Sequence, residues 1–228
     1  MQTIYAQIDK RKIEEMPTVL FDGRIITVAS EKETEKAVAY LSRFPELGLD
    51  TETRPNFHKG EGHKVSLLQL ATPDTCFLFR LCQMGIPDSL VALLSSKTQL
   101  KVGLSMGDDI RALNQRRQMQ FGRYVDLQKS VRNVGIMDMS LQKVYANLFG
   151  RKIAKGQRLT NWEAPNLTTS QQRYAATDAW ACLKIYHRLE ELLTSRDYRY
   201  VAPMSDERMF GLWLNELLRK LPIHAHKD

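Results

Sequence analysis

Three β-rich segments joined by short polar or glycine-containing links constrain what this chain can fold into more than any other feature. They are residues 46–53, 64–72 and 75–81. Consecutive strands with such links pair as antiparallel neighbours, whereas parallel pairs need a longer crossover. The segments therefore predict an antiparallel meander of three strands.

After residue 81 the pattern changes to helices alternating with short strands. Strand-like residues 99–105 and 123–128 flank a helical stretch through 108–117, which is the pattern of parallel crossovers. A long helix is predicted over 168–193, with Thr168 or Thr169 as its N-cap. The chain is expected to form an α/β fold with a mixed sheet of five to six strands, three antiparallel and the others parallel, flanked by helices.

The length of the chain and the positions of the first and last predicted elements indicate one main domain. A turn at Asp22 and Gly23 leads into the first strand, and Ser30 is the expected cap of the following helix. A chain of 228 residues suits one core. We expect a domain over 18–193 and a C-terminal helical extension, 194–228, that packs on it.

Composition excludes several classes of protein. No apolar run reaches the roughly 18 residues of a membrane helix, and the first residues lack the apolar core of a signal peptide, so a cytoplasmic protein is expected. The cysteines Cys76, Cys82 and Cys182 have no CxxC spacing, which indicates reduced core thiols. Net charge of +7 permits a polyanionic partner without requiring one.

Acidic side chains occur where an apolar strand ends and where helices could face the same sheet edge. Asp50 and Glu52 are two residues apart, so in a strand both point to one face. Tyr174 and Asp178 are four apart and share one helix face. Taken alone, each pair is also compatible with an ordinary solvated or packed surface.

Asp108 and Asp109 follow a third strand, at the start of a helix, where acids also serve as caps. In this order the motifs "LGLDTET", "KVGLSMGDDIRAL" and "YAATDA" resemble those of the DEDD 3′–5′ exonucleases of the ribonuclease H-like (DnaQ-like) fold. Ribonuclease D and Werner-type exonuclease domains belong to this family. The resemblance covers roughly residues 18–193.

Two details place the chain within the family that it resembles. A sister branch carries histidine five residues before the last aspartate; Arg173 stands there, while Tyr174 indicates the tyrosine branch. The count from "KVG" to Leu113 favours Asp109 over Asp108 as the motif acid, and leaves Asp108 as a cap.

The resemblance implies a catalytic site made of Asp50, Glu52, Asp109, Tyr174 and Asp178. The four carboxylates would hold two divalent cations, Mg²⁺ or Mn²⁺, which favour hard oxygen ligands. Asp50 would bridge both ions. Tyr174 would orient the attacking water, since a tyrosine with a pKa near its usual value of about 10 is a poor base.

Further residues are candidates for holding the substrate. Phe57 could stack on a terminal base and Lys64 could lie near phosphate, although a solvated loop with a core phenylalanine fits equally well. Lys155 and Arg158 belong to a basic strip that could follow the backbone or remain a solvated loop. Asp126 ends another strand and is expected to be a structural cap.

The expected activity is exonucleolytic hydrolysis from a single-stranded 3′ end, releasing nucleoside 5′-monophosphates, with nucleic acid as the partner and no membrane or obligate protein partner. A catalytically weak or inactive nucleic-acid-binding module on the same fold is the alternative. A more distant one is an endonuclease or nucleotidyl transferase. Nothing in the motifs distinguishes DNA from RNA.

Overall fold

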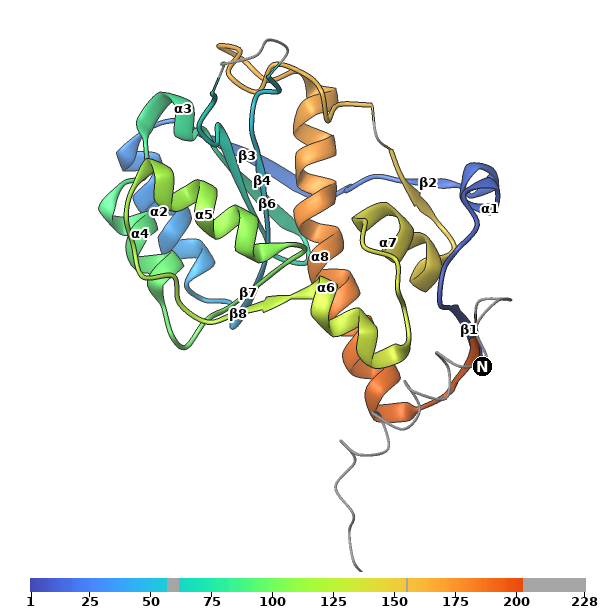
Figure 1. Cartoon of the computed structure of the whole chain (residues 1–228). Helices are drawn as coiled ribbons and strands as arrows, with labels where there is room; N and C mark the ends of the chain where they lie inside the picture. Colours follow the sequence, from blue (N-terminus) through green and yellow to red (C-terminus); the bar gives the residue numbers. More distant parts are fainter. Residues whose placement is uncertain (57–61, 155, 203–228) are drawn as a thin grey trace, which may run out of the picture.

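The computed structural model describes residues 1–56, 62–154 and 156–202 (Figure 1). The strands are β1 (Gln2–Tyr5), β2 (Thr18–Val19), β3 (Arg24–Val28), β4 (Glu46–Glu52), β5 (Leu67–Ala71), β6 (Thr75–Phe79), β7 (Leu100–Gly103), β8 (Tyr124–Asp126), β9 (Lys152–Ile153) and β10 (Tyr198–Val201). The helices are α1 (Lys10–Glu15), α2 (Glu31–Leu41), α3 (Leu81–Met84), α4 (Asp88–Ser95), α5 (Met106–Arg116), α6 (Leu127–Ser130), the 3₁₀ helix η1 (Val131–Val134), α7 (Leu141–Phe149) and α8 (Thr169–Ser195). Within the described ranges, no helix is both long and apolar enough to span a bilayer.

A six-stranded mixed sheet forms the centre, in the order β3-β6-β5-β4-β7-β8. Strands β4, β5 and β6 are antiparallel, as the three β-rich segments predict. Strands β7 and β8 continue from β4 in parallel, and β3 adds in parallel to β6 at the other edge. The predicted fold class is confirmed.

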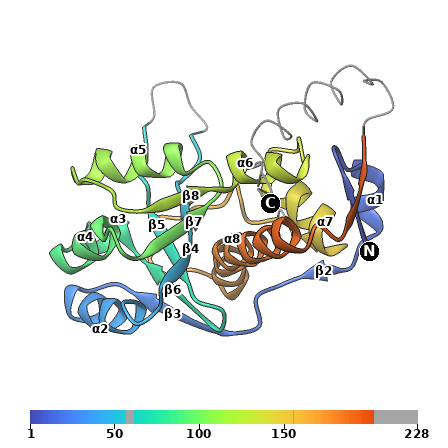
Figure 2. The same cartoon turned by 90° about the horizontal axis from the view of Figure 1, so that it is seen from below.

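Helices cover both faces of this sheet (Figure 2). Alternation along β4 separates the faces: Leu47 and Leu49 join the apolar cluster with α2, α4 and α5, while Gly48 faces α8. A Cβ at Gly48 would lie 2.0 Å from the carbonyl oxygen of Ala179, so only glycine lets α8 approach β4 this closely. The long helix α8 therefore lies directly against the strand that carries Asp50 and Glu52.

Most predicted helix ends are confirmed. Ser30 and Thr168 each form a capping box with the residue three positions later, and Gly150 ends α7 in the left-handed region with φ of 62°. The expectation that Asp108 caps α5 is wrong, because the helix begins at Met106 and its N-cap is Ser105.

Two short parallel strand pairs join segments from the first 20 residues to segments late in the chain. Strand β1 pairs in parallel with β10, and β2 with β9. Ile4 is fully buried in the cluster that also contains residues of α7 and α8, so the residues before the predicted domain pack with it. The bounds 18–193 and 194–228 stay predictions. Of the expected helical extension only residues 194–202 are described, where α8 ends at Ser195 and β10 follows, and the rest lies outside the described residues.

Candidate active site

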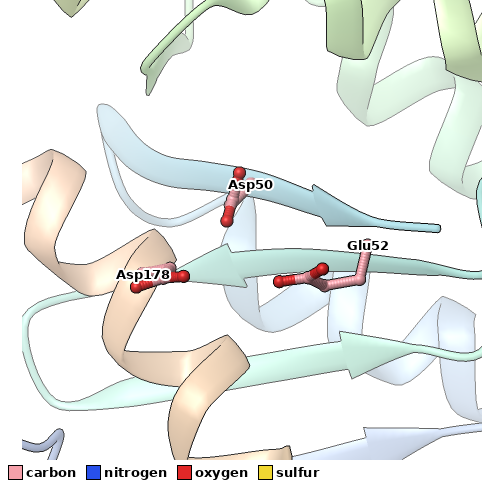
Figure 3. Close-up of side chains that lie close together, drawn as sticks. All are labelled: Asp50, Glu52 and Asp178. Atoms are coloured by element: carbon pink, nitrogen blue, oxygen red, sulfur yellow. The ribbon is translucent and has the colours of Figure 1, made fainter. Parts of the chain in front are cut away.

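Three of the predicted acids come together between β4 and α8. One carboxylate oxygen each from Asp50, Glu52 and Asp178 lies within 4.8 Å of the others. Figure 3 shows Asp50 and Glu52 on the strand and Asp178 reaching them from the helix. The strand period of two puts Asp50 and Glu52 on the same face of β4, and the close approach of α8 at Gly48 brings Asp178 next to them. The arrangement is a group of oxygen donors of the size that one or two small cations occupy.

Asp109 is not one of these three acids and lies on the other side of β4, although its charge raises the pKa of Asp50. Thr51, which lies between the two acids of the strand and points to the opposite face, donates a hydrogen bond of 2.6 Å from its hydroxyl to Asp109. This role of Thr51 was not predicted from the sequence; the available signal was its position between two acids, on the opposite face of the strand. Of the two adjacent aspartates, Asp109 is 9% exposed, whereas Asp108 is exposed and pairs with Arg111.

The turn before α5 fixes where Asp109 lies. Ser105 has φ of 64°, a conformation that is costly for a residue other than glycine. One oxygen of Asp126 accepts hydrogen bonds from the backbone N–H groups of Ser105 and Gln128, at 3.0 Å each. Asp126 thus caps α6, as predicted, and also holds the turn that leads into α5.

The carboxylates repel one another in a buried setting. Burial, followed by the charges of Asp109, Asp178 and Glu52, raises the pKa of Asp50 well above its ordinary value. Burial also raises the pKa of Asp178 to about 7 and that of Glu52 to about 9. For Asp109 burial raises the pKa to about 6, against the hydrogen bond from Thr51. The four carboxylates can carry more negative charge than the surrounding side chains neutralise, and this favours the binding of cations.

Tyr174 stands one helical turn before Asp178, as the spacing predicts. Its hydroxyl donates a hydrogen bond to Asp178, which lowers the pKa of that carboxyl. Burial and the nearby acids raise the pKa of Tyr174 far above its ordinary value. The ring packs against Trp162 with centroids 6.1 Å apart. The phenol is therefore a neutral, fixed donor beside the carboxylates.

Of the predicted substrate-binding residues, Arg158 is linked to the site. Its side chain is exposed, and its charge lowers the pKa of Glu52. Lys64 is exposed on the segment before β5. Phe57 and Lys155 lie outside the described residues.

A cavity of about 260 Å³ borders Tyr174 on the side of β9. Its walls include Leu20, Ile153, Arg173 and Tyr174, but none of the four carboxylates. Arg173, which stands where the sister branch has histidine, therefore lines this cavity and not the acidic group.

The segments around the site are tied together by polar contacts. Glu163, from the segment before α8, accepts from Arg54 at 3.4 Å and lies 3.5 Å from His63. Arg80 is 2% exposed and donates to the carbonyl oxygens of Ala164 and Pro165. These contacts join the segment before α8 to residues that follow β4, precede β5 and follow β6, and none of them was predicted from the sequence.

Comparison with known proteins identifies the family. A family model described as 3′-5′ exonuclease matches residues 25–194. The chain is 27% identical over 212 residues to a 3′-5′ exonuclease of Arabidopsis thaliana, covering 81% of this chain and 70% of that protein. It is 30% identical to the exonuclease 3′-5′ domain-containing protein 2 of Mus musculus, covering 78% of this chain. It is 29% identical to the mouse bifunctional 3′-5′ exonuclease/ATP-dependent helicase WRN, covering 82% of this chain. The matches span only 30% and 14% of these two mouse proteins.

Solved structures agree on the fold. The Nibbler EXO domain of Aedes aegypti superposes with a TM-score of 0.69 at 23% identity, covering 86% of this chain and 95% of that one. Escherichia coli RNase D superposes with a TM-score of 0.67 at 20% identity, covering 76% and 46%. With a family model that matches most of its length, this chain belongs to the 3′-5′ exonuclease family, hydrolases that act on nucleic acids.

Proposed function

We propose that the protein is a metal-dependent exonuclease that removes nucleoside 5′-monophosphates from the 3′ end of single-stranded nucleic acid. The observation that carries the proposal is the group of Asp50, Glu52 and Asp178, whose oxygens lie within 4.8 Å of one another. Phosphodiester hydrolysis needs charge neutralisation at the phosphate and an activated water, and carboxylates that bind divalent cations provide for both. The intact acid set supports catalysis over the alternative of an inactive binding module.

The residues fit Mg²⁺ or Mn²⁺. Their donors are carboxylate oxygens, which these hard cations prefer. Burial is the main cause of the raised pKa values of Glu52 and Asp178, and a bound cation would offset it by stabilising the charged carboxylates. Asp50, Glu52 and Asp178 would hold the ions, with Asp50 shared between two. Asp109 would complete the set, since its charge already raises the pKa of Asp50. When bound, such ions neutralise phosphate charge and lower the pKa of an attacking water.

Tyr174 would position that water. Because the pKa of its hydroxyl is raised far above the ordinary value, the phenol stays protonated at neutral pH and does not act as a base. The hydroxyl has one hydrogen, which it donates to Asp178, so its oxygen would accept a hydrogen bond from the water and fix the direction in which that water points. We assign orientation, not proton removal, to this side chain.

The strand itself would be held at its backbone. Arg158 lies within electrostatic reach of Glu52, so it can neutralise a phosphate that approaches the acids. We propose Lys64, Lys155 and Phe57 as further contacts, two cationic and one for base stacking. Contacts to phosphate and base faces carry no sequence preference, which suits an enzyme that shortens strands stepwise.

The test is an assay with 5′-labelled single-stranded DNA and RNA oligonucleotides in Mg²⁺ or Mn²⁺. A ladder of products shortened by one nucleotide at a time, with nucleoside 5′-monophosphate released, is expected. Binding without shortening would support the inactive module. Cleavage of a circular single strand, which has no end, would favour an endonuclease.

Substitution Tyr174→Phe is expected to lower kcat by about 10- to 100-fold, because the water loses the hydrogen bond that orients it. The affinity for Mn²⁺, measured by calorimetry, should change little, since the four carboxylates remain. An unchanged kcat would remove Tyr174 from the proposed site. The parallel variant Tyr40→Phe, whose phenol lies on α2 near Thr75, serves as the control.

Substitution Arg158→Ala is expected to raise KM for an oligonucleotide severalfold and to leave kcat nearly unchanged. The plot of log KM against log salt concentration should become shallower by about 0.7, the change expected for one lost phosphate contact to a single strand. Lys32→Ala, an exposed residue on α2 across the sheet, should leave both values at the wild-type level. Equal behaviour of the two variants would contradict the assignment.

A further inference from the structure

Gln69 is a buried polar side chain without a described partner. It lies in the middle of β5 and is 0% exposed. Neither its amide nitrogen nor its amide oxygen makes a hydrogen bond in the part of the chain that the structure describes. Buried amides without partners reduce stability and are rare in folded proteins, so this one calls for a reason.

The position of Gln69 relative to the acids supplies that reason. In the antiparallel pair of β4 and β5, Gln69 is directly opposite Asp50. Directly opposed residues project to the same face, with Cβ atoms about 4.5–5.5 Å apart. On the other side of β5 it is opposite Leu78, which offers no polar group. Asp50 is therefore the one polar side chain in its two cross-strand pairs.

Gln69 lies on the face of the sheet that α8 covers. Its neighbours at two residues' distance, Leu67 and Ala71, belong to the apolar cluster that contains Ala175, Ala176 and Ala179 of α8. This places the amide beneath α8, in the layer from which Asp178 joins Asp50.

We propose that Gln69 is a positioning residue whose side-chain amide donates a hydrogen bond to the carboxylate of Asp50 when that carboxylate binds a divalent cation. It would fix the orientation in which that carboxylate holds a divalent cation. An amide suits this place better than lysine or arginine, because it donates without adding a positive charge that would compete with the cation. Hydrogen bonds to metal-ligating carboxylates raise metal affinity in this way. This inference rests on the proposed function, in which Asp50 is a metal ligand.

The experiment compares two buried glutamines replaced by methionine, which has a similar shape and no amide. Gln69→Met should lower the affinity for Mn²⁺, measured by calorimetry, by about 10- to 100-fold. Its melting temperature in EDTA should be equal to or above that of the wild type, because in the absence of metal the substitution removes a buried amide that has no partner. Gln99→Met is the matched control, since Gln99 is 6% exposed and donates to the carbonyl oxygens of Leu41 and Phe44. That variant should be less stable and should bind Mn²⁺ like the wild type.

A second readout does not depend on a variant that folds. In the wild-type protein, the side-chain amide resonances of Gln69 should shift when Mg²⁺ is added, and those of Gln99 should not. In Asp50→Asn the Mg²⁺-dependent shift of Gln69 should disappear.

The outcomes separate this inference from the proposed function. If Gln69→Met binds Mn²⁺ as tightly as the wild type, or the Gln69 amide does not respond to Mg²⁺, Gln69 does not position Asp50, while the proposed function stands. If the wild type itself binds no Mn²⁺ at millimolar concentration, the proposed function fails and the inference falls with it. Loss of Mn²⁺ affinity in Gln69→Met but not in Gln99→Met supports it.

Discussion

Substitution Asp50→Asn is expected to abolish exonuclease activity, with a loss on the order of 10³-fold or more, or about 4 kcal/mol of transition-state stabilisation. Asp50 lies within 4.8 Å of both Glu52 and Asp178, and it is the residue proposed to be shared between two cations. Asparagine has nearly the same shape but carries no charge. The measurement is the rate of shortening of a 5′-labelled oligonucleotide at saturating Mg²⁺.

The same variant should fold at least as well as the wild type without metal. Burial and three neighbouring carboxylates raise the pKa of Asp50, so a neutral side chain at this position relieves repulsion. Its melting temperature in EDTA at pH 8 is therefore expected to equal or exceed that of the wild type. Asp108→Asn is the control, because Asp108 is exposed beside Asp109 and pairs with Arg111; it should retain activity. Retained activity in Asp50→Asn would contradict the proposed site.

Divalent metal is expected to stabilise the folded protein, and to do so more strongly as pH rises. At about 100 times its dissociation constant, Mg²⁺ should add about 2.7 kcal/mol. For a domain of this size that corresponds to a rise in melting temperature of about 5–10 °C. Binding requires deprotonated carboxylates, so protons bound to the empty site compete with the metal.

The sign of the pH dependence without metal follows from the raised pKa values. Burial raises the pKa of Asp109 to about 6, of Asp178 to about 7 and of Glu52 to about 9, from 3.8, 3.8 and 4.5. The folded state thus holds protons that the unfolded state has lost. Stability in EDTA should be fully present below about pH 4 as far as these groups are concerned, and should fall as pH rises through 6, 7 and 9. The slope is about 1.4 kcal/mol per pH unit for each group that differs.

The measurement is thermal unfolding between pH 5 and 9, in EDTA and in Mg²⁺. The two curves should diverge as pH rises. Asp178→Asn removes one of the shifted groups, so its curve in EDTA should be shallower up to about pH 7. Parallel curves for the wild type would mean that the carboxylates do not bind the metal.

Local sequence patterns were enough to predict the antiparallel part of the sheet and most of the helix ends. The β-rich segments 46–53, 64–72 and 75–81 became β4, β5 and β6 with the predicted antiparallel pairing, because strand period and short links act over a few residues. The caps at Ser30 and Thr168 were predictable for the same reason. The N-cap of α5 could not be predicted from the local sequence. It depends on Asp126 of β8, which accepts a hydrogen bond from Ser105 and holds it in the conformation that starts the helix before Asp108.

The sequence by itself determined which acids belong together, through their order, their spacing and the resemblance of their motifs to one family. Only the tertiary structure decided how they meet. Asp178 of α8 meets Asp50 and Glu52 at one face of β4, whereas Asp109 lies on the opposite side of the strand, where Thr51 donates a hydrogen bond to it. It also decided that Gln69 lies opposite Asp50. Spacing fixes the face on which a side chain emerges, but distance between segments depends on strand register and helix packing, which are set by contacts across the whole chain.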